Sequence, residues 1–239
     1  DPAFGLPAVW IDAASRDQAQ AYGYTVVDAS TVVATHLNHL VLSHAAELLG
    51  RQETQALLDH LAKDMPKLIE DLVPKILPLG VVQKVLQNLL EESVHIRDMR
   101  TIIEILADNA TRTQDTEVLT ALVRNALGRS IVQQLFAGSS EMQVMSLDPQ
   151  LERILVQAVS GSGEGAAIEP GMADTLMRES AAAAQRQEEL GLPSVLLVPA
   201  NLRTLLSRFL RRSIPQLKVL AHSEVPDTKT IKVTSIIGG

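Results

Sequence analysis

Between residues 51 and 135 the chain repeats apolar side chains every three or four positions. Because residues at this spacing share one face of an α-helix, the pattern predicts helices over 51–65, 67–72, 81–90, 99–109 and 117–135. Aromatic residues make up only 3% of the chain, so the core has to be built from Leu, Val, Ile and Ala. Such helices bury their apolar faces only against each other or against a neighbouring layer.

Beyond residue 140 the pattern changes to short aliphatic runs that alternate with helical stretches. We expect strands at 142–145, 194–198, 217–220 and 231–236, and helices at 149–159, 171–191 and 201–212. The Gly- and Ser-rich residues 161–165 are expected to form a loop. The chain is therefore predicted to be an α+β protein of several subdomains, mostly helical, with an all-helical middle and a C-terminal α/β unit. That unit is expected to hold a small mixed sheet, parallel in part.

The first 50 residues combine extended and helical signals. Residues 1–27 are expected to form extended and turn structure, with a polar stretch at 13–21 that suits a helix. Asp28 and the Ser and Thr that follow it supply oxygen side chains where a helix begins, and that helix is expected to reach residue 48. Gly50 is predicted to end it in the left-handed conformation.

Composition excludes several classes of protein. The net charge of −7 argues against a nucleic-acid partner, since proteins that bind nucleic acid carry basic surfaces. The absence of cysteine excludes disulfides, cysteine-ligated zinc and a cysteine nucleophile. No apolar run reaches the ~20 residues that cross a bilayer. The chain begins at Asp1 without an initiator Met or a signal peptide, so we interpret it as a piece of a longer protein.

Motifs for catalysis or metal binding are weak. His36 and His39 share a helix face, yet a zinc-protease helix needs two His four positions apart, so surface histidines are the preferred interpretation. The glycines of 161–165 lack the dinucleotide spacing, and neither a phosphate-binding loop nor a serine-hydrolase elbow occurs. Neighbouring carboxylates such as Glu91 and Glu92 point to different helix faces. We therefore expect no enzyme, no metal and no cofactor.

Five stretches of the sequence carry a recognisable pattern. They are FGLPAVWI at 4–11, GYTVVDASTVVATHL at 23–37, KVLQNLL at 84–90, IRDMRTI at 96–102 and IKVTSIIGG at 231–239. The pattern resembles the C-terminal cytoplasmic region of flagellar type III export-gate proteins, the FHIPEP family, and the resemblance runs from the first residue to the last.

The resemblance implies both an organisation and a role. Residues 1–28 would finish a small subdomain begun upstream, 29–49 would complete another, 50–128 would form a helical domain and 129–239 a C-terminal α/β domain. The role is a docking platform on the cytoplasmic face of the bacterial inner membrane, joined to the membrane only through upstream sequence. The implied partners are flagellar chaperone–cargo complexes, other export-apparatus proteins including the ATPase complex, and further copies of the chain in a ring.

The resemblance also implies a docking site. In the family, a hydrophobic dimple with an adjacent acidic residue receives the chaperone of a late substrate. The matching positions in this chain are Asp1, Phe4, Val27, Val32 and Thr35. An apolar patch rimmed by polar groups suits weak, exchangeable binding. The competing interpretation is that Phe4, Val27 and Val32 are ordinary core residues.

Other interpretations stay open. Arg203, Arg208, Arg211 and Arg212 gather near a helix C-terminus, where the helix dipole favours cations; the alternative is contact with a neighbouring subunit or an acidic export component. For the whole chain, the alternatives are the equivalent protein of a virulence-type injection system, a ring scaffold without cargo contact, and an enzyme built on the α/β unit. The enzyme requires a pocket with perturbed titratable groups at the strand ends.

Overall fold

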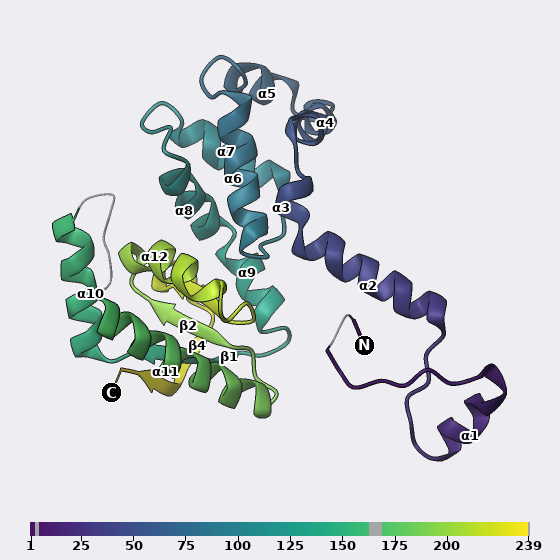
Figure 1. Ribbon diagram of the computed structural model, residues 1–239. Helices are drawn as coiled ribbons and strands as arrows, with labels where there is room; N and C mark the ends of the chain where they lie inside the picture. The colour runs from purple at the N-terminus through teal and green to yellow at the C-terminus, as the bar shows by residue number, and fades with distance from the viewer. Residues whose placement is uncertain (3–4, 163–168, 239) are drawn as a thin grey trace.

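The computed structural model describes residues 1–2, 5–162 and 169–238. The chain forms an N-terminal arm (residues 1–49), a block of helices (51–135) and a parallel sheet flanked by further helices (Figure 1). Within the described residues, no helix combines the length and apolar character needed to span a membrane. The prediction of a mostly helical α+β chain with an all-helical middle is confirmed.

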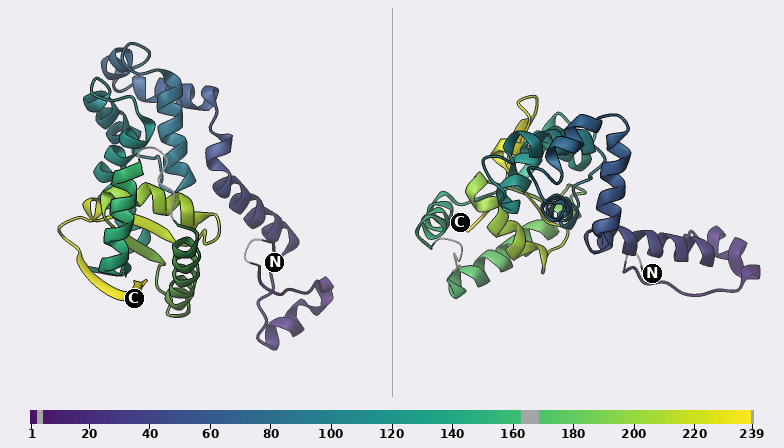
Figure 2. Two further views of the ribbon diagram at one scale, coloured as in Figure 1. Left: turned by 60° about the vertical axis from the view of Figure 1, so that its left-hand side comes forward. Right: turned by 90° about the horizontal axis from the view of Figure 1, so that it is seen from above.

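The arm contains little regular structure before residue 29. The short helices η1 (Ala13–Ser15) and α1 (Arg16–Ala21) confirm the helix expected at 13–21, and α2 (Ala29–Ser43) and α3 (Ala45–Leu48) follow. Asp28 precedes α2 as expected but does not cap it, because its carboxylate accepts a 3.0 Å hydrogen bond from Arg16. Figure 2 shows α1 and α2 standing away from the rest of the chain.

The prediction for Gly50 is wrong. Its φ of −86° and ψ of −171° are extended, so Gly50 does not end the preceding helix in the left-handed conformation. It instead precedes the next helix, and its N–H donates to the Glu53 carboxylate at 3.0 Å. A side chain that satisfies a backbone donor ahead of the first turn is half of a capping box, and it starts a helix rather than ending one.

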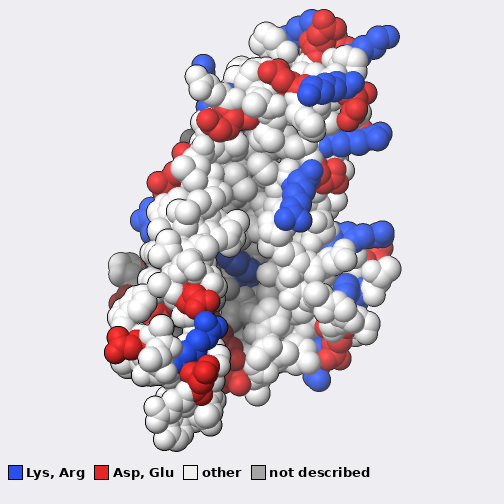
Figure 3. Space-filling view, turned by 90° about the vertical axis from the view of Figure 1, so that its right-hand side faces the viewer, with Lys and Arg blue, Asp and Glu red and all other residues white. Residues whose placement is uncertain are grey.

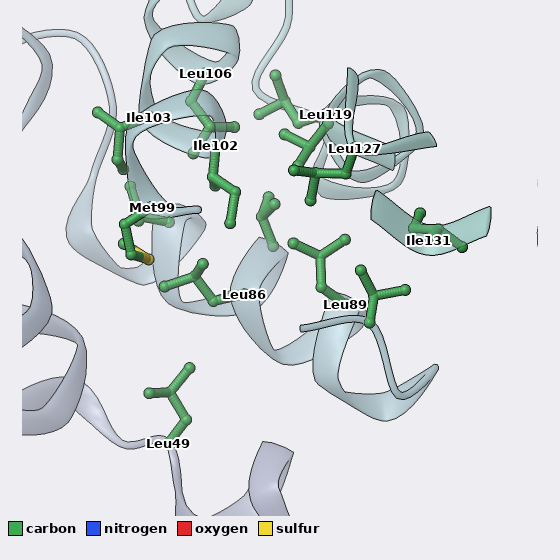
Figure 4. Packing of buried hydrophobic residues seen from close by; sticks show 14 of the residues in the cluster. Leu49, Leu86, Leu89, Met99, Ile102, Ile103, Leu106, Leu119, Leu127 and Ile131 are labelled. Atoms are coloured by element: carbon green, nitrogen blue, oxygen red, sulfur yellow. The ribbon is translucent and has the colours of Figure 1, made fainter. Parts of the chain in front are cut away.

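The helical block agrees closely with the predicted pattern. It consists of α4 (Arg51–Ala62), α5 (Pro66–Leu72), α6 (Leu79–Glu91), α7 (Met99–Asn109), α8 (Thr116–Ala126) and α9 (Gly128–Leu135). Asp98 and Asp115 start α7 and α8 by accepting hydrogen bonds from first-turn N–H groups. Figure 4 shows aliphatic side chains from α6 to α9 meeting in the middle of the block.

The single helix expected at 117–135 is broken at Leu127 into α8 and α9. Gly128 begins α9 where the backbone of Glu224 comes close. A Cβ at Gly128 would lie 2.3 Å from the Glu224 carbonyl oxygen. The break therefore lets α9 turn and lie directly against a segment almost a hundred residues further along the chain.

The sheet consists of β1 (Glu141–Leu147), β2 (Val195–Val198), β3 (Lys218–Ala221) and β4 (Thr230–Ile237) in the order β3-β2-β1-β4. Every neighbouring pair is parallel, so the expected mixed sheet is corrected to a wholly parallel one. β4 pairs with β1 through a bulge, where Val144 faces Val233 and Met145 faces Ser235.

The remaining helices are α10 (Pro149–Ser162), α11 (Pro170–Glu189), α12 (Ala200–Arg211) and η3 (His222–Glu224). Of the loop expected at 161–165, residues 163–165 lie outside the described residues, while 161 and 162 complete α10.

Two apolar cores lie on the two faces of the sheet. One joins the helical block to one sheet face, and it includes Leu86, Ile102, Val144 and Leu197. The other joins the opposite face to α10, α11 and α12. A parallel sheet is stable only when both faces are covered. Here the helical block covers one of them, so it and the sheet share a continuous core.

Candidate functional site

The docking positions lie on the arm. Val27 is 49% exposed and precedes α2. Val32 and Thr35 are half-buried and lie three residues apart, so they share a face of the first turns of α2. Asp1 is half-buried, and its terminal ammonium donates to the Leu6 carbonyl oxygen at 2.6 Å. Phe4 lies outside the described residues.

Most of the large apolar side chains that the structure leaves exposed are on the arm. They are Leu6, Val9, Trp10, Ile11, Tyr22, Tyr24, Val27, Val33, Leu37, Leu40, Val41, Leu42 and Leu48. The described part of α2 contains no buried residue. Apolar side chains exposed in this number usually contact another element of the same protein or another protein. The resemblance described above implies that residues 1–49 complete subdomains begun upstream, which would supply such contacts.

The positions of Val27 and Val32 can be compared with the two cores of the described residues. Neither residue belongs to the core on either face of the sheet. Among the described residues of the arm, Leu49 belongs to the buried core and is 7% exposed. The Leu49 carbonyl oxygen accepts hydrogen bonds from Gln83 at 3.2 Å and Gln87 at 2.9 Å. Two donors from α6 therefore hold the last residue of the arm against the helical block.

A buried charge cluster lies where the helical block meets α12 and η3. It consists of Glu92, Arg124, Arg203 and Glu224. Arg124 binds Glu224 through two hydrogen bonds of 2.6 and 3.1 Å, and both side chains are almost fully buried. Arg203 donates to Glu92 at 2.5 Å, and Arg124 Nη1 lies 3.1 Å from the same Glu92 oxygen. Positive and negative side chains thus alternate in the cluster. Glu92 and Arg124 come from the helical block, and Arg203 and Glu224 come from α12 and η3.

The cluster lowers the pKa of Glu92. Burial acts to raise that pKa, because it disfavours the carboxylate form, but the guanidinium groups of Arg124 and Arg203 outweigh burial. Glu92 is therefore more acidic in the folded chain than its ordinary value of 4.5. A carboxylate with a lowered folded pKa stabilises the fold above its unfolded pKa, and this stabilisation is lost as the pH falls through the folded pKa.

Acid titration of stability tests this role of Glu92. We expect the free energy of unfolding to fall as the pH drops below about 4.5, the unfolded value. Glu92→Gln should be less stable at pH 7 and should show a flatter dependence on pH in the acid range. Urea unfolding at a series of pH values measures both effects. Glu104→Gln is the control, because Glu104 pairs with Arg100 on an exposed helix surface. An equal change of acid slope in both variants would contradict the assignment.

The arginines of α12 have partners that the sequence analysis missed. Arg203 belongs to the charge cluster, Arg208 pairs with Glu117 at 2.6 Å, and Arg211 pairs with Glu91 at 2.7 Å. These carboxylates belong to α8 or to the C-terminal end of α6. The dipole interpretation is therefore insufficient, since three of the four arginines connect α12 to the helical block of the same chain.

Metal-binding groups and titratable side chains with shifted pKa values bear on the enzyme interpretation. Within the described ranges, no group of three or more His, Cys, Asp or Glu side chains is arranged to hold a metal ion. The titratable groups with a shifted pKa near the sheet include Glu92 and Lys218. Arg124 and Arg203 keep the Glu92 carboxylate ionised, which makes it a weak base at neutral pH. Lys218 donates a hydrogen bond to Ser93 at 3.1 Å; burial lowers the pKa of Lys218, and the Glu92 carboxylate partly opposes this effect.

Comparison with known proteins identifies the family. The family model described as the FHIPEP family matches residues 1–230. The chain belongs to the FHIPEP family. The Flagellar biosynthesis protein FlhA of Escherichia coli (strain K12) is 59% identical over 239 residues, which is all of this chain and 34% of that protein. The chain therefore spans about a third of the length of the curated FHIPEP relatives that it matches. The name of this relative describes no enzyme, which agrees with the prediction that the chain is not one.

Solved structures share the fold of this FHIPEP chain. The Chlamydia pneumoniae CdsV protein superimposes with a TM-score of 0.84 at 24% identity, over 99% of this chain and 68% of that one. The nonameric EscV cytosolic domain from the type III secretion system superimposes with a TM-score of 0.76 at 26% identity, over 94% and 68% of the two chains. The arm, the helical block and the sheet therefore follow an arrangement that other proteins also adopt.

Proposed function

We propose that this chain is a docking platform of the flagellar type III protein export gate, which binds chaperone–cargo complexes and passes cargo toward the membrane channel. The observation that carries this proposal is the 59% identity of the whole chain to a flagellar biosynthesis protein. The proposed docking positions lie on the arm, where Val27 is exposed and Val32 and Thr35 are half-buried. Apolar side chains beside polar groups suit a partner that must both bind and leave.

The higher sequence identity to a flagellar relative supports the flagellar assignment over the virulence-type one. The chain is 59% identical to a flagellar biosynthesis protein but 26% identical to the EscV domain of a type III secretion system. A shared fold at the lower identity is compatible with a common mode of assembly, whereas the higher identity favours shared partners. The virulence-type system remains the second candidate.

The same reasoning extends to assembly and location. The EscV domain is nonameric, and we propose that copies of this chain likewise form a homo-oligomeric ring. The ring would lie on the cytoplasmic face of the inner membrane, attached through sequence upstream of Asp1. Further partners would be other export-apparatus proteins, including the ATPase complex. Neither a cofactor nor an enzymatic step enters this function.

Binding of a purified flagellar chaperone–cargo complex tests the proposal. The protein is a cytoplasmic domain extended upstream of Asp1, and calorimetry measures its affinity for the complex. Phe4→Ala, Val27→Ala and Thr35→Met should each weaken binding about tenfold, as expected for residues near the centre of a small interface. The midpoint of thermal unfolding should not change.

Val118→Ala is the matched control for Val27→Ala. Val118 lies on α8 and is 46% exposed, against 49% for Val27, so the two substitutions remove similar surface at distant places. Binding should be unchanged by the control. If all arm variants bind as tightly as the parent, the arm is not the docking site. If the parent itself binds no such complex, the scaffold or the virulence-type system becomes the better proposal.

A further inference from the structure

Two hollows meet on the side of the molecule where the arm joins the helical block. The first, about 220 Å³, lies between the end of α6, α9 and the turn before β3, and Ser43 of α2 contributes to its wall. The second, about 240 Å³, lies beside Pro193 and Gln216. Leu135 and Lys218 line both hollows, so the two adjoin. Figure 3 shows the surface hollowed beside the arm, with a basic side chain in the floor.

The charges around the first hollow do not balance. Its lining includes the cations Arg124, Arg211 and Lys218 and the carboxylates Glu91 and Glu92. Glu91 pairs with Arg211 at 2.7 Å, and Glu92 lies 3.1 Å from Arg124. Among the carboxylates of the described residues, none forms an ion pair with Lys218. Lys218 therefore has no carboxylate of the described residues at ion-pair distance, and Glu92 acts on it only from further away.

Lys218 has a hydrogen-bond donor to spare. Its ammonium donates to the Ser93 hydroxyl oxygen at 3.1 Å and to the Pro215 carbonyl oxygen at 3.2 Å. An ammonium group carries three donors, and the described residues supply acceptors for two of them. Both acceptors are neutral, so a carboxylate brought to the third position would form a stronger, charge-assisted hydrogen bond.

The rest of the lining mixes apolar and polar side chains, and Glu188, Ser194 and Gln216 line the second hollow. Val94, Ile131, Leu135 and Leu217 contribute to the first hollow, and Leu192 and Pro193 to the second. Each hollow is smaller than the 300–1,000 Å³ typical of pockets for small-molecule ligands and cofactors. Two small adjoining hollows with a cation between them suit adjacent side chains of an extended segment better than one compact ligand.

We propose that this paired hollow is a docking site for an extended acidic peptide segment of a partner protein, which places a Glu or Asp carboxylate on Lys218 and apolar side chains in the two hollows. The site is distinct from the docking positions of the arm, so it requires neither Val27 nor Thr35. It uses side chains from α9 and from the start of β3, which belong to different layers of the fold.

The state of Lys218 fits this role. Burial lowers the pKa of Lys218, and the Glu92 carboxylate only partly opposes this effect. A partly desolvated ammonium loses less hydration when a partner arrives than a fully exposed one does. An incoming carboxylate would raise the pKa of Lys218 again, because an opposite charge favours the protonated form.

Titration with two defined peptides tests the site. The probes are acetyl-Leu-Glu-Leu-amide and acetyl-Leu-Gln-Leu-amide, added to the 239-residue chain while methyl resonances of Leu135 and Leu217 are followed by NMR. We expect the Glu peptide to shift these resonances and to bind about tenfold more tightly than the Gln peptide, since one charge-assisted hydrogen bond separates them. Lys218→Gln should remove this preference. Lys75→Gln should keep the preference for the Glu peptide. Lys75 follows α5, lines neither hollow and pairs with Asp71.

Three outcomes would overturn the proposal. Equal affinity of the Glu and Gln peptides, or an unchanged preference in Lys218→Gln, would remove the role of the lysine. Sodium acetate that shifts the same methyl resonances with the affinity of the Glu peptide would identify a small-anion site instead. If the methyl resonances shift when the concentration of the chain is raised without peptide, the occupant of the hollows is a second copy of the chain.

Discussion

Arg124→Ala is expected to destabilise the chain by about 3–5 kcal/mol, because it leaves the Glu224 carboxylate buried without its partner. Glu224 is 2% exposed and would lose the two hydrogen bonds that Arg124 supplies, keeping the Ala221 N–H at 3.1 Å and the Arg203 guanidinium at 3.9 Å. Typical domains are stable by about 5–15 kcal/mol, so this single change would remove a large share of the total. Urea unfolding followed by circular dichroism measures the loss.

Two further variants separate burial from charge. Arg208→Ala removes the ion pair with Glu117, whose side chains are 56% and 46% exposed, and should cost under about 1 kcal/mol. The double variant Arg124→Ala/Glu224→Ala should be less unstable than the sum of the two single losses, since neither charge is then left alone. Losses of similar size for Arg124→Ala and Arg208→Ala would contradict the assigned importance of the buried pair.

Gly128→Ala is expected to destabilise the chain by about 1–3 kcal/mol, the usual cost of an overpacked contact. The added Cβ would lie 2.3 Å from the Glu224 carbonyl oxygen and 3.0 Å from its carbonyl carbon. These atoms are backbone, so the conflict can be relieved only by moving η3 or α9. The movement would also disturb Glu224 in the charge cluster. Thermal unfolding of the variant measures the effect.

Gly80→Ala is the control, because its expected change in stability is zero or positive rather than negative. Gly80 lies in α6, and a Cβ there would meet only the Arg51 side chain, at an ordinary 3.5 Å. Replacing this helical glycine should leave stability unchanged or raise it by up to about 1 kcal/mol, because the unfolded chain loses conformational freedom. A destabilisation equal to that of Gly128→Ala would show that close approach to Glu224 is not the cause.

Much of the fold could be predicted because its signals are local. The apolar stripes of α6 and α7 and the oxygen side chain of Asp98 lie within single helices. The direction of the strands was predicted only in part. The helices between strands indicated parallel pairs, but the strand sequences did not show that every pair is parallel. The break at Leu127 was also missed. Glycine is needed at position 128 because the backbone of Glu224 comes close, and this contact is not visible in the sequence of the helix itself.

The candidate site was likewise predictable only in part. The arm positions Val27, Val32 and Thr35 came from resemblance, and their role remains a proposal. The partners of Arg203, Arg208 and Arg211 lie 111, 91 and 120 residues away in the sequence. Pairing over such separations leaves no periodic trace in the sequence. A cluster of arginines on one helix therefore signalled a charged contact but not its location.

The position of β4 has a consequence for how the chain is made. β1 lies between β2 and β4 in the sheet, yet residues 230–237 of β4 follow β1 by more than eighty positions. During synthesis, β1 and β2 emerge from the ribosome well before the strand that completes their sheet. Until residue 237 has emerged, the N–H and C=O groups along one side of β1 are left without their final partners. Such an open edge readily pairs with other extended chains. The nascent protein therefore keeps this edge of β1 open from the time β1 emerges until β4 can pair with it.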